Sequence, residues 1–187
     1  MSLIPRLDME TLRADVAEAL EPRVRRLGYL GEFFRVAGHQ PDALRDFIGY
    51  TDSAKAGLEK KFVEVIALTA AGRIGNAYER NQHERLSVRL GFGRDWVQAV
   101  NALDPEAAGD LLTPEERVTQ SFVLEALKGE GTLGAPRILP SLVEAIGHEG
   151  AVAVMFVLGR YLIHGLFVNT LELAPPVPSI FEDGFKG

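Results

Sequence analysis

Apolar positions recur every three to four residues along most of the chain, which is the spacing of one face of an α-helix. The pattern predicts a first helix over residues 8–27 and a second over 29–37. A third is predicted to begin at Pro41, and the apolar run from Phe62 to Ala71 predicts a buried fourth helix. No segment alternates with the period of two that a half-buried strand needs. The sequence therefore predicts an all-α fold.

The second half of the chain continues the helical pattern. Thr113, Pro114 and Glu116 stand in the N-cap, N1 and N3 positions of a helix start, and that helix is predicted to run to Lys128. The other elements predicted in this half are helices over 95–102, 140–146 and 151–168, a loop over 129–134, and an extended proline-containing arm over 174–187.

The stretch 151–168 is apolar nearly all round its predicted helix, which raises the question of a membrane span. Arg160 and His164 interrupt it one helical turn apart, and a span needs about 20 predominantly apolar residues. A helix that is apolar on every side is otherwise a central core helix or one shared with another subunit. We therefore expect no membrane contact.

Composition narrows the class of protein. A chain of 187 residues is expected to form one domain over 1–187, and 47% hydrophobic with 25% charged residues is typical of a soluble globular protein. The net charge of −6, with no sustained basic run, argues against a nucleic-acid partner. The sequence has no cysteine, which excludes thiolate chemistry, and its start lacks the features of a signal peptide, so we expect a cytoplasmic protein.

The candidate chemistry lies in the segment that follows the buried fourth helix. Asn76, Glu79 and His83 fall at i, i+3 and i+7 and so predict one polar stripe on a helix, while Glu64 is the single acid of the preceding apolar run. Two carboxylates and an imidazole that converge can transfer protons. The alternative is that Glu79 and His83 form an exposed i, i+4 pair, worth a few tenths of a kcal/mol.

Glu64 sharpens this choice, because a buried carboxylate needs a partner or a raised pKa. His83 is the expected partner, with Lys60, Lys61 or Arg73 as alternatives at the surface.

Three further side chains carry two interpretations each. Tyr78 could donate a hydrogen bond to a substrate oxygen or anchor the core. His164 is interpreted as a core histidine rather than a ligand, and Arg160 could receive an anion or hold an interface together.

The segment from Glu64 to Gly91, with Asn76, Tyr78-Glu79 and His83 at this spacing, resembles the carboxymuconolactone decarboxylase and alkylhydroperoxidase D-like family. The resemblance extends over residues 30–175. It implies an all-helical, single-domain bundle that assembles as trimers or hexamers, with its active site near a subunit interface.

The chain also departs from that family. In the alkylhydroperoxidase D branch two cysteines on this helix carry the thiol chemistry, and the resemblance places them at Asn76 and Glu79. Thiol peroxidase activity is therefore excluded, and a peroxidase-related name would describe ancestry rather than activity. The proton-relay positions of the family, Glu64 and His83, both remain, which is closer to the decarboxylase branch.

The leading hypothesis is a cofactor-free lyase acting on a small organic acid or lactone. His83 moves the proton, Glu79 orients His83, and Glu64 is the second acid or base. Asn76 and Tyr78 bind the substrate and stabilise the developing negative charge.

Local cations for such a substrate are expected at Arg73 or Arg160. A second hypothesis has Glu64, Glu79 and His83 bind Mn, Fe or Zn. A third is a non-catalytic helical oligomer that binds a small apolar ligand or a protein partner. In each case the long apolar helix and the arm predict a homo-oligomer, whether dimer, trimer or hexamer.

Overall fold

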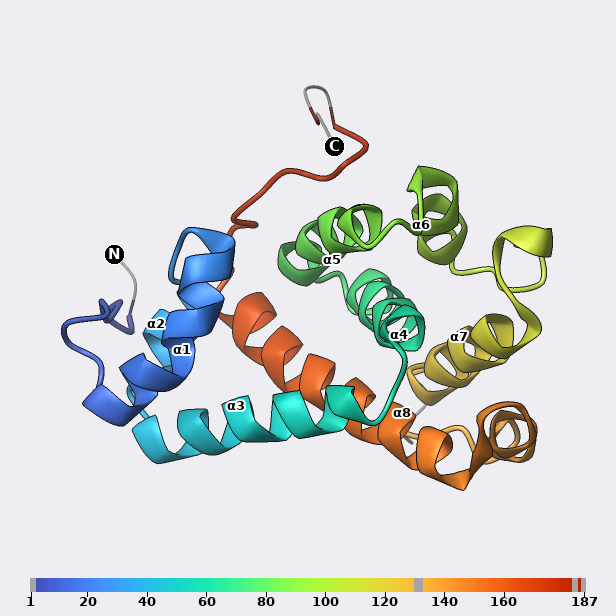
Figure 1. The fold of residues 1–187 in the computed structure, drawn as a ribbon, viewed down its shortest axis with the longest axis horizontal. Helices are drawn as coiled ribbons and strands as arrows, with labels where there is room; N and C mark the ends of the chain where they lie inside the picture. The colour runs from blue at the N-terminus through green and yellow to red at the C-terminus, as the bar shows by residue number, and fades with distance from the viewer. Residues whose placement is uncertain (1–2, 130–132, 183–184, 186–187) are drawn as a thin grey trace. The chain divides into compact units, whose positions relative to one another are not determined.

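The computed structural model describes residues 3–129, 133–182 and 185. Over these residues the chain forms eight α-helices and one 3-10 turn with no strand, which confirms the all-α prediction (Figure 1). Contacts divide the chain into two compact units, residues 1–53 and 54–187, so the expectation of one domain stays a prediction. The elements are α1 Ala14–Leu27, α2 Glu32–Ala37, α3 Pro41–Ala56, α4 Lys60–Arg73, α5 Ala77–Arg89, α6 Arg94–Asn101, η1 Gly109–Leu111, α7 Pro114–Ala126 and α8 Leu139–Thr170.

The first unit contains α1, α2 and most of α3. The prediction that the first helix begins at residue 8 was wrong, because α1 begins at Ala14. The hydroxyl of Thr11 accepts a hydrogen bond from the backbone N–H of Asp8 at 2.8 Å, and the Thr11 N–H donates to the Asp8 carbonyl at 2.9 Å. These local bonds form a turn that competes with the helix. The second helix likewise begins at Glu32 rather than at residue 29.

The second unit is built around α4. This helix packs against α5, α7 and α8, and α7 also packs against α8 (Figure 1). Every residue of α4 from Val63 to Ala71 is buried, which explains why this stretch is apolar on all sides and why its one acid is exceptional. The start of α7 has the predicted capping box, with Thr113 and Glu116 bonding each other's backbone N–H.

Helix α8 bends at Gly147, which has φ 74° and ψ 172°. A positive φ of this size favours glycine, so the predicted break between 140–146 and 151–168 is present. By length and composition α8 could cross a membrane, but half of its most apolar window is buried inside the molecule. The burial supports its interpretation as a core helix.

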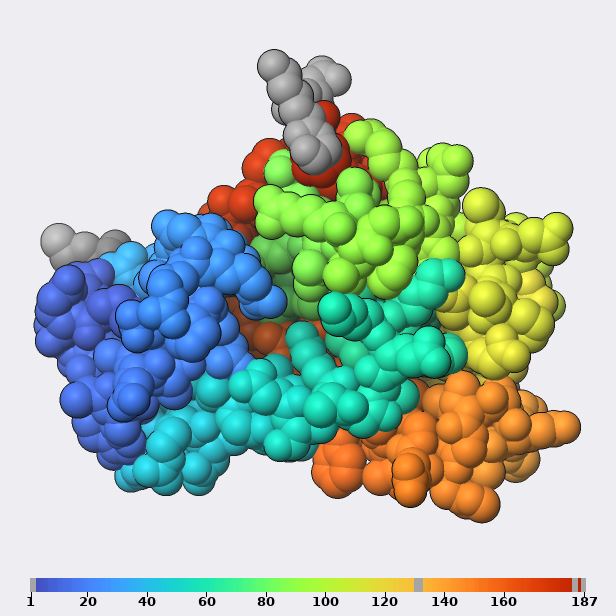
Figure 2. All heavy atoms as spheres, viewed as in Figure 1, coloured from blue at the N-terminus to red at the C-terminus, as the bar shows by residue number. Residues whose placement is uncertain are grey.

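The C-terminal arm lies against α5, where its red segment borders the green of α5 in Figure 2. Asn81 and Arg85 donate to the carbonyls of Val177 and Pro178 at 3.0 and 2.8 Å. The arm is neither helix nor strand from 174 to 182, as predicted, and Ile180 is fully buried. Residues 183–184 and 186–187 of the predicted arm, and 130–132 of the predicted loop, lie outside the described part.

Candidate functional site

The start of α5 is fixed by Asn76, which is the N-cap residue. Its side-chain Oδ1 accepts the backbone N–H of Glu79 at 3.0 Å, and this bond satisfies one of the free donors at the helix N-terminus. Helix α8 approaches this turn closely at Gly165, where an added Cβ would lie 2.4 Å from Ile74 Cδ1. The cap and the close approach set the face that α5 turns towards α8.

The predicted partnership between Glu64 and His83 is confirmed. Glu64 Oε2 lies 2.7 Å from His83 Nδ1, and the hydroxyl of Ser87, one turn along α5, donates to the same oxygen at 3.3 Å. Glu64, Glu79 and His83 are 3, 4 and 6% exposed, so the alternative of an exposed helix pair is wrong.

Two of the other candidate partners of Glu64 have contacts elsewhere. Lys61 pairs with Glu116 at 3.1 Å, and Arg73 donates to the carbonyls of Leu127 and Lys128 at the end of α7. Arg73 is thus engaged in holding the end of α7.

Glu79 occupies the opposite edge of the imidazole. Its Oε2 lies 3.1 Å from His83 Nε2, while its Oε1 accepts a hydrogen bond from Arg160 Nη1 at 2.8 Å. His164 Nδ1 is 3.0 Å from the same Oε1, a close contact without the alignment of a hydrogen bond. Both α8 residues are buried, so the long apolar helix supplies the cation that compensates a buried carboxylate.

Tyr161 completes the cluster, and the sequence interpretation did not assign it a role. Its hydroxyl lies 3.2 Å from His83 Nε2, and the two rings meet edge to face with centroids 5.3 Å apart. Lys55 Nζ lies 5.2 Å from the centre of the tyrosine ring. The available signal was position: Tyr161 follows Arg160 and precedes His164 by three residues on the same predicted helix.

The surroundings set the charges of these groups. Burial disfavours the charged imidazole, but Glu64 and Glu79 outweigh it and raise the pKa of His83 above its usual value. Burial would also raise the pKa of Glu79, yet Arg160 and the two histidines hold it well below its usual range. Burial raises the pKa of Tyr161 well above its usual value and lowers that of His164 to about 3. The two carboxylates therefore favour the imidazolium form of His83, whereas burial favours the neutral forms of Tyr161 and His164.

Asn76 and Tyr78, predicted to bind substrate, have structural contacts in this chain. Asn76 caps α5, as described above. Tyr78 is buried in a cluster with Val168 and Leu173, and its ring centroid lies 5.6 Å from that of His164. These contacts match the interpretation of Tyr78 as a core anchor, while a role for either residue towards substrate stays a prediction.

The arrangement does not suit a metal ion shared by the three motif residues. Glu64 and Glu79 contact different nitrogens of one imidazole, so the three cannot converge on one ion as they stand. Within residues 3–129, 133–182 and 185, no group of three or more His, Asp or Glu is placed to hold a metal.

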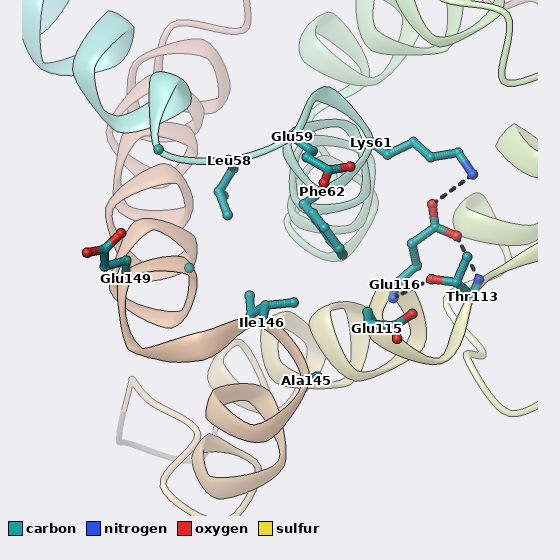
Figure 3. A pocket seen from close by; sticks show the side chains of 12 residues that line it. Leu58, Glu59, Lys61, Phe62, Thr113, Glu115, Glu116, Ala145, Ile146 and Glu149 are labelled. Atoms are coloured by element: carbon teal, nitrogen blue, oxygen red, sulfur yellow. Dashed lines mark hydrogen bonds and ion pairs between the residues drawn. The ribbon is translucent and has the colours of Figure 1, made fainter.

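A separate cavity of about 590 Å³ opens between α4, α7 and the bend of α8 (Figure 3). In it Lys61 faces Glu116, which also bonds Thr113, while Glu59 and Glu149 are exposed. None of the predicted site residues lines this cavity, so it is not the place of the proton-transfer cluster.

No family model and no curated protein sequence matches this chain. Solved structures do match in fold. The debrominase Bmp8, in a variant with alanine in place of one cysteine and bound to 2,3,4-tribromopyrrole, is 18% identical with a TM-score of 0.75, over 93% of this chain and 91% of that one.

Two bacterial proteins are also similar. One from Agrobacterium tumefaciens, of unknown function and suggested to be the antioxidant defence protein AhpD, is 20% identical with a TM-score of 0.67, over 76% and 96% of the two chains. One from Ralstonia eutropha JMP134, a peroxidase-related protein with the alkylhydroperoxidase AhpD core, is 18% identical with a TM-score of 0.66, over 93% and 92%. The chain therefore has the alkylhydroperoxidase D-like fold that its motif predicted.

Proposed function

We propose that this protein is a proton-transfer enzyme acting on a small organic acid or lactone, with His83 giving or taking the proton. One observation carries the proposal: the buried imidazole is held at both nitrogens, by Glu64 at 2.7 Å and by Glu79 at 3.1 Å. A positioned imidazole whose protonation is controlled by neighbours is a general acid or base. The fold shared with a debrominase and with peroxidase-related proteins supports an enzyme.

The side chains around His83 have separate roles in the proposed proton transfer. Glu64 fixes the Nδ1 edge, and the Nε2 edge faces both Glu79 and the Tyr161 hydroxyl. The Nε2 proton then passes to the substrate either directly or through the Tyr161 hydroxyl, which gives its own proton as it receives the one from His83. A free phenolate does not accumulate in this scheme, because burial raises the pKa of Tyr161 well above its usual value.

Glu79 acts on His83 through its charge. Because it bonds Arg160, it remains an anion and favours the imidazolium form of His83. It therefore orients and charges the acid, as the sequence predicted, and takes no proton itself.

Decarboxylation of a lactone acid is the reaction that this arrangement serves best. The bond between the ring carbon and the carboxylate breaks, its electron pair enters the ring as a dienolate, and carbon dioxide leaves. The proton from His83 then ends on carbon. A positioned general acid contributes roughly 10²–10⁴-fold to such a step.

The relation to the debrominase is one of fold, and the chemistry proposed differs from a thiol reaction. The crystallised debrominase variant carries alanine in place of a cysteine, whereas this chain has no cysteine. The bound tribromopyrrole still suggests a useful probe, because it is a small ring compound bound by a protein of the same fold.

A carboxylate substrate needs a cation near His83. Arg73 bonds the end of α7 and Arg160 bonds Glu79, so the two cations expected from the sequence are already engaged. Lys55 is a further cation at the cluster, half-buried with its Nζ 5.2 Å from the centre of the Tyr161 ring.

The test is a thermal-shift screen of lactone acids, other small carboxylic acids and 2,3,4-tribromopyrrole. A ligand present at a hundred times its Kd stabilises by about 2.7 kcal/mol, which raises the Tm of a chain of this size by roughly 5–10 °C. Each stabilising compound is then incubated in D₂O and followed by NMR for loss of carbon dioxide and for deuterium on carbon.

The same assay is run on two matched variants. His83→Gln is expected to lose turnover while keeping its helical circular dichroism, and His148→Gln, an exposed histidine at the bend of α8, is expected to behave as wild type. Turnover that survives in His83→Gln would refute the role given to His83. Binding without turnover in wild type would leave the protein as a small-ligand binder of this fold.

A further inference from the structure

The outward face of α8 is apolar along more than four turns. Every exposed residue between Val152 and Val168 is apolar, with side chains 43–67% exposed: Val152, Met155, Phe156, Ile163 and Leu166. A helix at the surface of a soluble protein ordinarily turns charged or polar residues outward. Together with half-buried Gly159 and Leu162 these residues form what we call the outer stripe.

The outer stripe is symmetric about Gly159. Its members stand three, four and seven residues before the glycine and three, four and seven residues after it. The stripe therefore presents the same pattern when the helix direction is reversed, as a two-fold interface requires: residue i contacts j while j contacts i. The glycine at the centre has no side chain to keep two helix backbones apart.

We propose that α8 pairs with α8 of a second copy of this chain, antiparallel, about a two-fold axis at Gly159. In this pairing Val152 faces Leu166, Met155 faces Ile163, and Phe156 faces Leu162 of the other copy. The proposal does not rest on the proposed function.

The ends of the stripe and its size fit such a pair. Exposed polar residues follow at both ends, Glu149 before it and Asn169 after it, giving an apolar centre with a polar rim. The exposed parts of the five side chains amount to roughly 400–500 Å² per copy, when an aromatic side chain is taken as 150–250 Å² and an aliphatic one as somewhat less. Complete burial of these parts in both copies would remove roughly 800–1,000 Å² from water, which is at the lower limit for a biological interface.

A cavity beside the outer stripe of one copy can receive a side chain from the outer stripe of the other copy. It measures about 260 Å³, and its apolar lining includes Leu133, Met155 and Leu162. Since Phe156 of the second copy faces Leu162, its ring is placed to enter this cavity. Large aromatic side chains seated in such pockets are the anchors of many interfaces.

The pairing would also support the proton-transfer cluster. Arg160, Tyr161 and His164 lie on the buried face of the same helix turns. A second copy packed on the outer face would hold these turns from behind.

The first test is multi-angle light scattering on the full chain at micromolar concentration. Wild type is expected at twice the 20.4 kDa chain mass, or at a higher even multiple. Phe156→Asp is expected to run as a monomer with unchanged helical circular dichroism. Leu111→Asp is the matched control, because Leu111 is exposed to a similar degree, 50% against 53%, but lies off the stripe; it should keep the wild-type mass.

The second test uses the absence of cysteine to read the direction of the helices. Proteins carrying Met155→Cys and Ile163→Cys are oxidised separately and as a mixture. An antiparallel pair brings these two positions within disulfide reach of each other, so the crosslinked dimer is expected mainly in the mixture. This readout remains informative if Phe156→Asp fails to fold.

Three results would overturn the proposal. These are a wild-type monomer or trimer, loss of assembly in Leu111→Asp to the same extent as in Phe156→Asp, and crosslinking of Met155→Cys with itself as efficient as in the mixture. If the wild-type monomer also sediments with vesicles of phosphatidylcholine and phosphatidylglycerol, the stripe is assigned to a lipid surface.

Discussion

Replacing Glu64 by Gln tests whether the charge of Glu64 controls the protonation of His83, on which the proposed function depends. The amide keeps the size and shape of the carboxyl group but removes its charge, and it stays within hydrogen-bond reach of His83 Nδ1. Glu64 is the strongest of the groups that raise the pKa of His83, ahead of Glu79. The pKa of His83 should therefore fall in the variant, because burial then opposes a single carboxylate.

The size of the fall follows from the contact. A neighbouring opposite charge within about 4–6 Å shifts a pKa by about 1–3 units, and the Glu64 oxygen lies closer, at 2.7 Å. Losing this interaction disfavours the imidazolium, so the pKa of His83 should be lower in the variant than in wild type.

The effect on stability has a defined sign. In wild type the folded pKa of His83 is raised, so its contribution is fully present below about pH 6.5 and is lost as pH rises through the folded pKa. The free energy of unfolding of wild type should therefore decline with pH above 6.5. In Glu64→Gln this decline should flatten or reverse.

Two measurements check this reasoning between pH 5.5 and 9. NMR titration gives the pKa of each of the four histidines, with His83 assigned from the spectrum of His83→Gln. Urea unfolding at each pH gives the free energy. If the pKa of His83 is the same in wild type and in Glu64→Gln, the charge of Glu64 does not control the protonation of the imidazole, and the proposed proton relay is refuted.

Three further predictions concern the surroundings of the cluster. Arg160→Leu leaves the Glu79 carboxylate buried without its arginine and should lower the free energy of unfolding in urea by about 3–5 kcal/mol. Adding Glu79→Leu to this variant should recover much of the loss. Equal stability of the single and the double variant would contradict the pairing. The folded pKa of His164 is lowered to about 3, so its stabilising contribution should be lost as pH falls below about 6.5. This loss adds up to about 1.4 kcal/mol per pH unit to the slope of the unfolding free energy. The added slope should vanish in His164→Gln but not in His148→Gln. Ile180→Ala should cost about 2–5 kcal/mol because the arm buries this side chain completely, and a loss near zero would show that the arm is not docked.

Most of the helical fold could be predicted from local signals. The capping box at Thr113 and the bend at Gly147 follow from residue chemistry within a few positions, and the structure has both. The start of α1 could not be placed, because helical spacing continues back to Asp8 while the Thr11 hydroxyl diverts the backbone there into a turn. Propensity and spacing do not decide between two local hydrogen-bonding patterns of similar strength.

The candidate site was predictable only in part, for a related reason. A lone acid in an apolar run identified Glu64, and the polar stripe of α5 identified its partner. The contacts made by Tyr161 and Arg160 join residues 78 and 81 positions apart, and no spacing rule reaches that far. Asn76 was predicted to bind substrate although Asn is a preferred N-cap residue, and the cap is the role that the structure shows.

The pairing of Glu79 with Arg160 explains how this chain accommodates a carboxylate in the interior of the fold. The resemblance places Glu79 where the alkylhydroperoxidase D branch has a cysteine. A buried carboxylate at this position needs a cation, because an unpaired charge is costly in a protein interior. Arg160 supplies it from α8, and the same helix turn brings Tyr161 to the imidazole. The carboxylate at position 79 and the cation on α8 are therefore one coupled feature. Replacing Glu79 alone by Cys would leave Arg160 buried without its carboxylate.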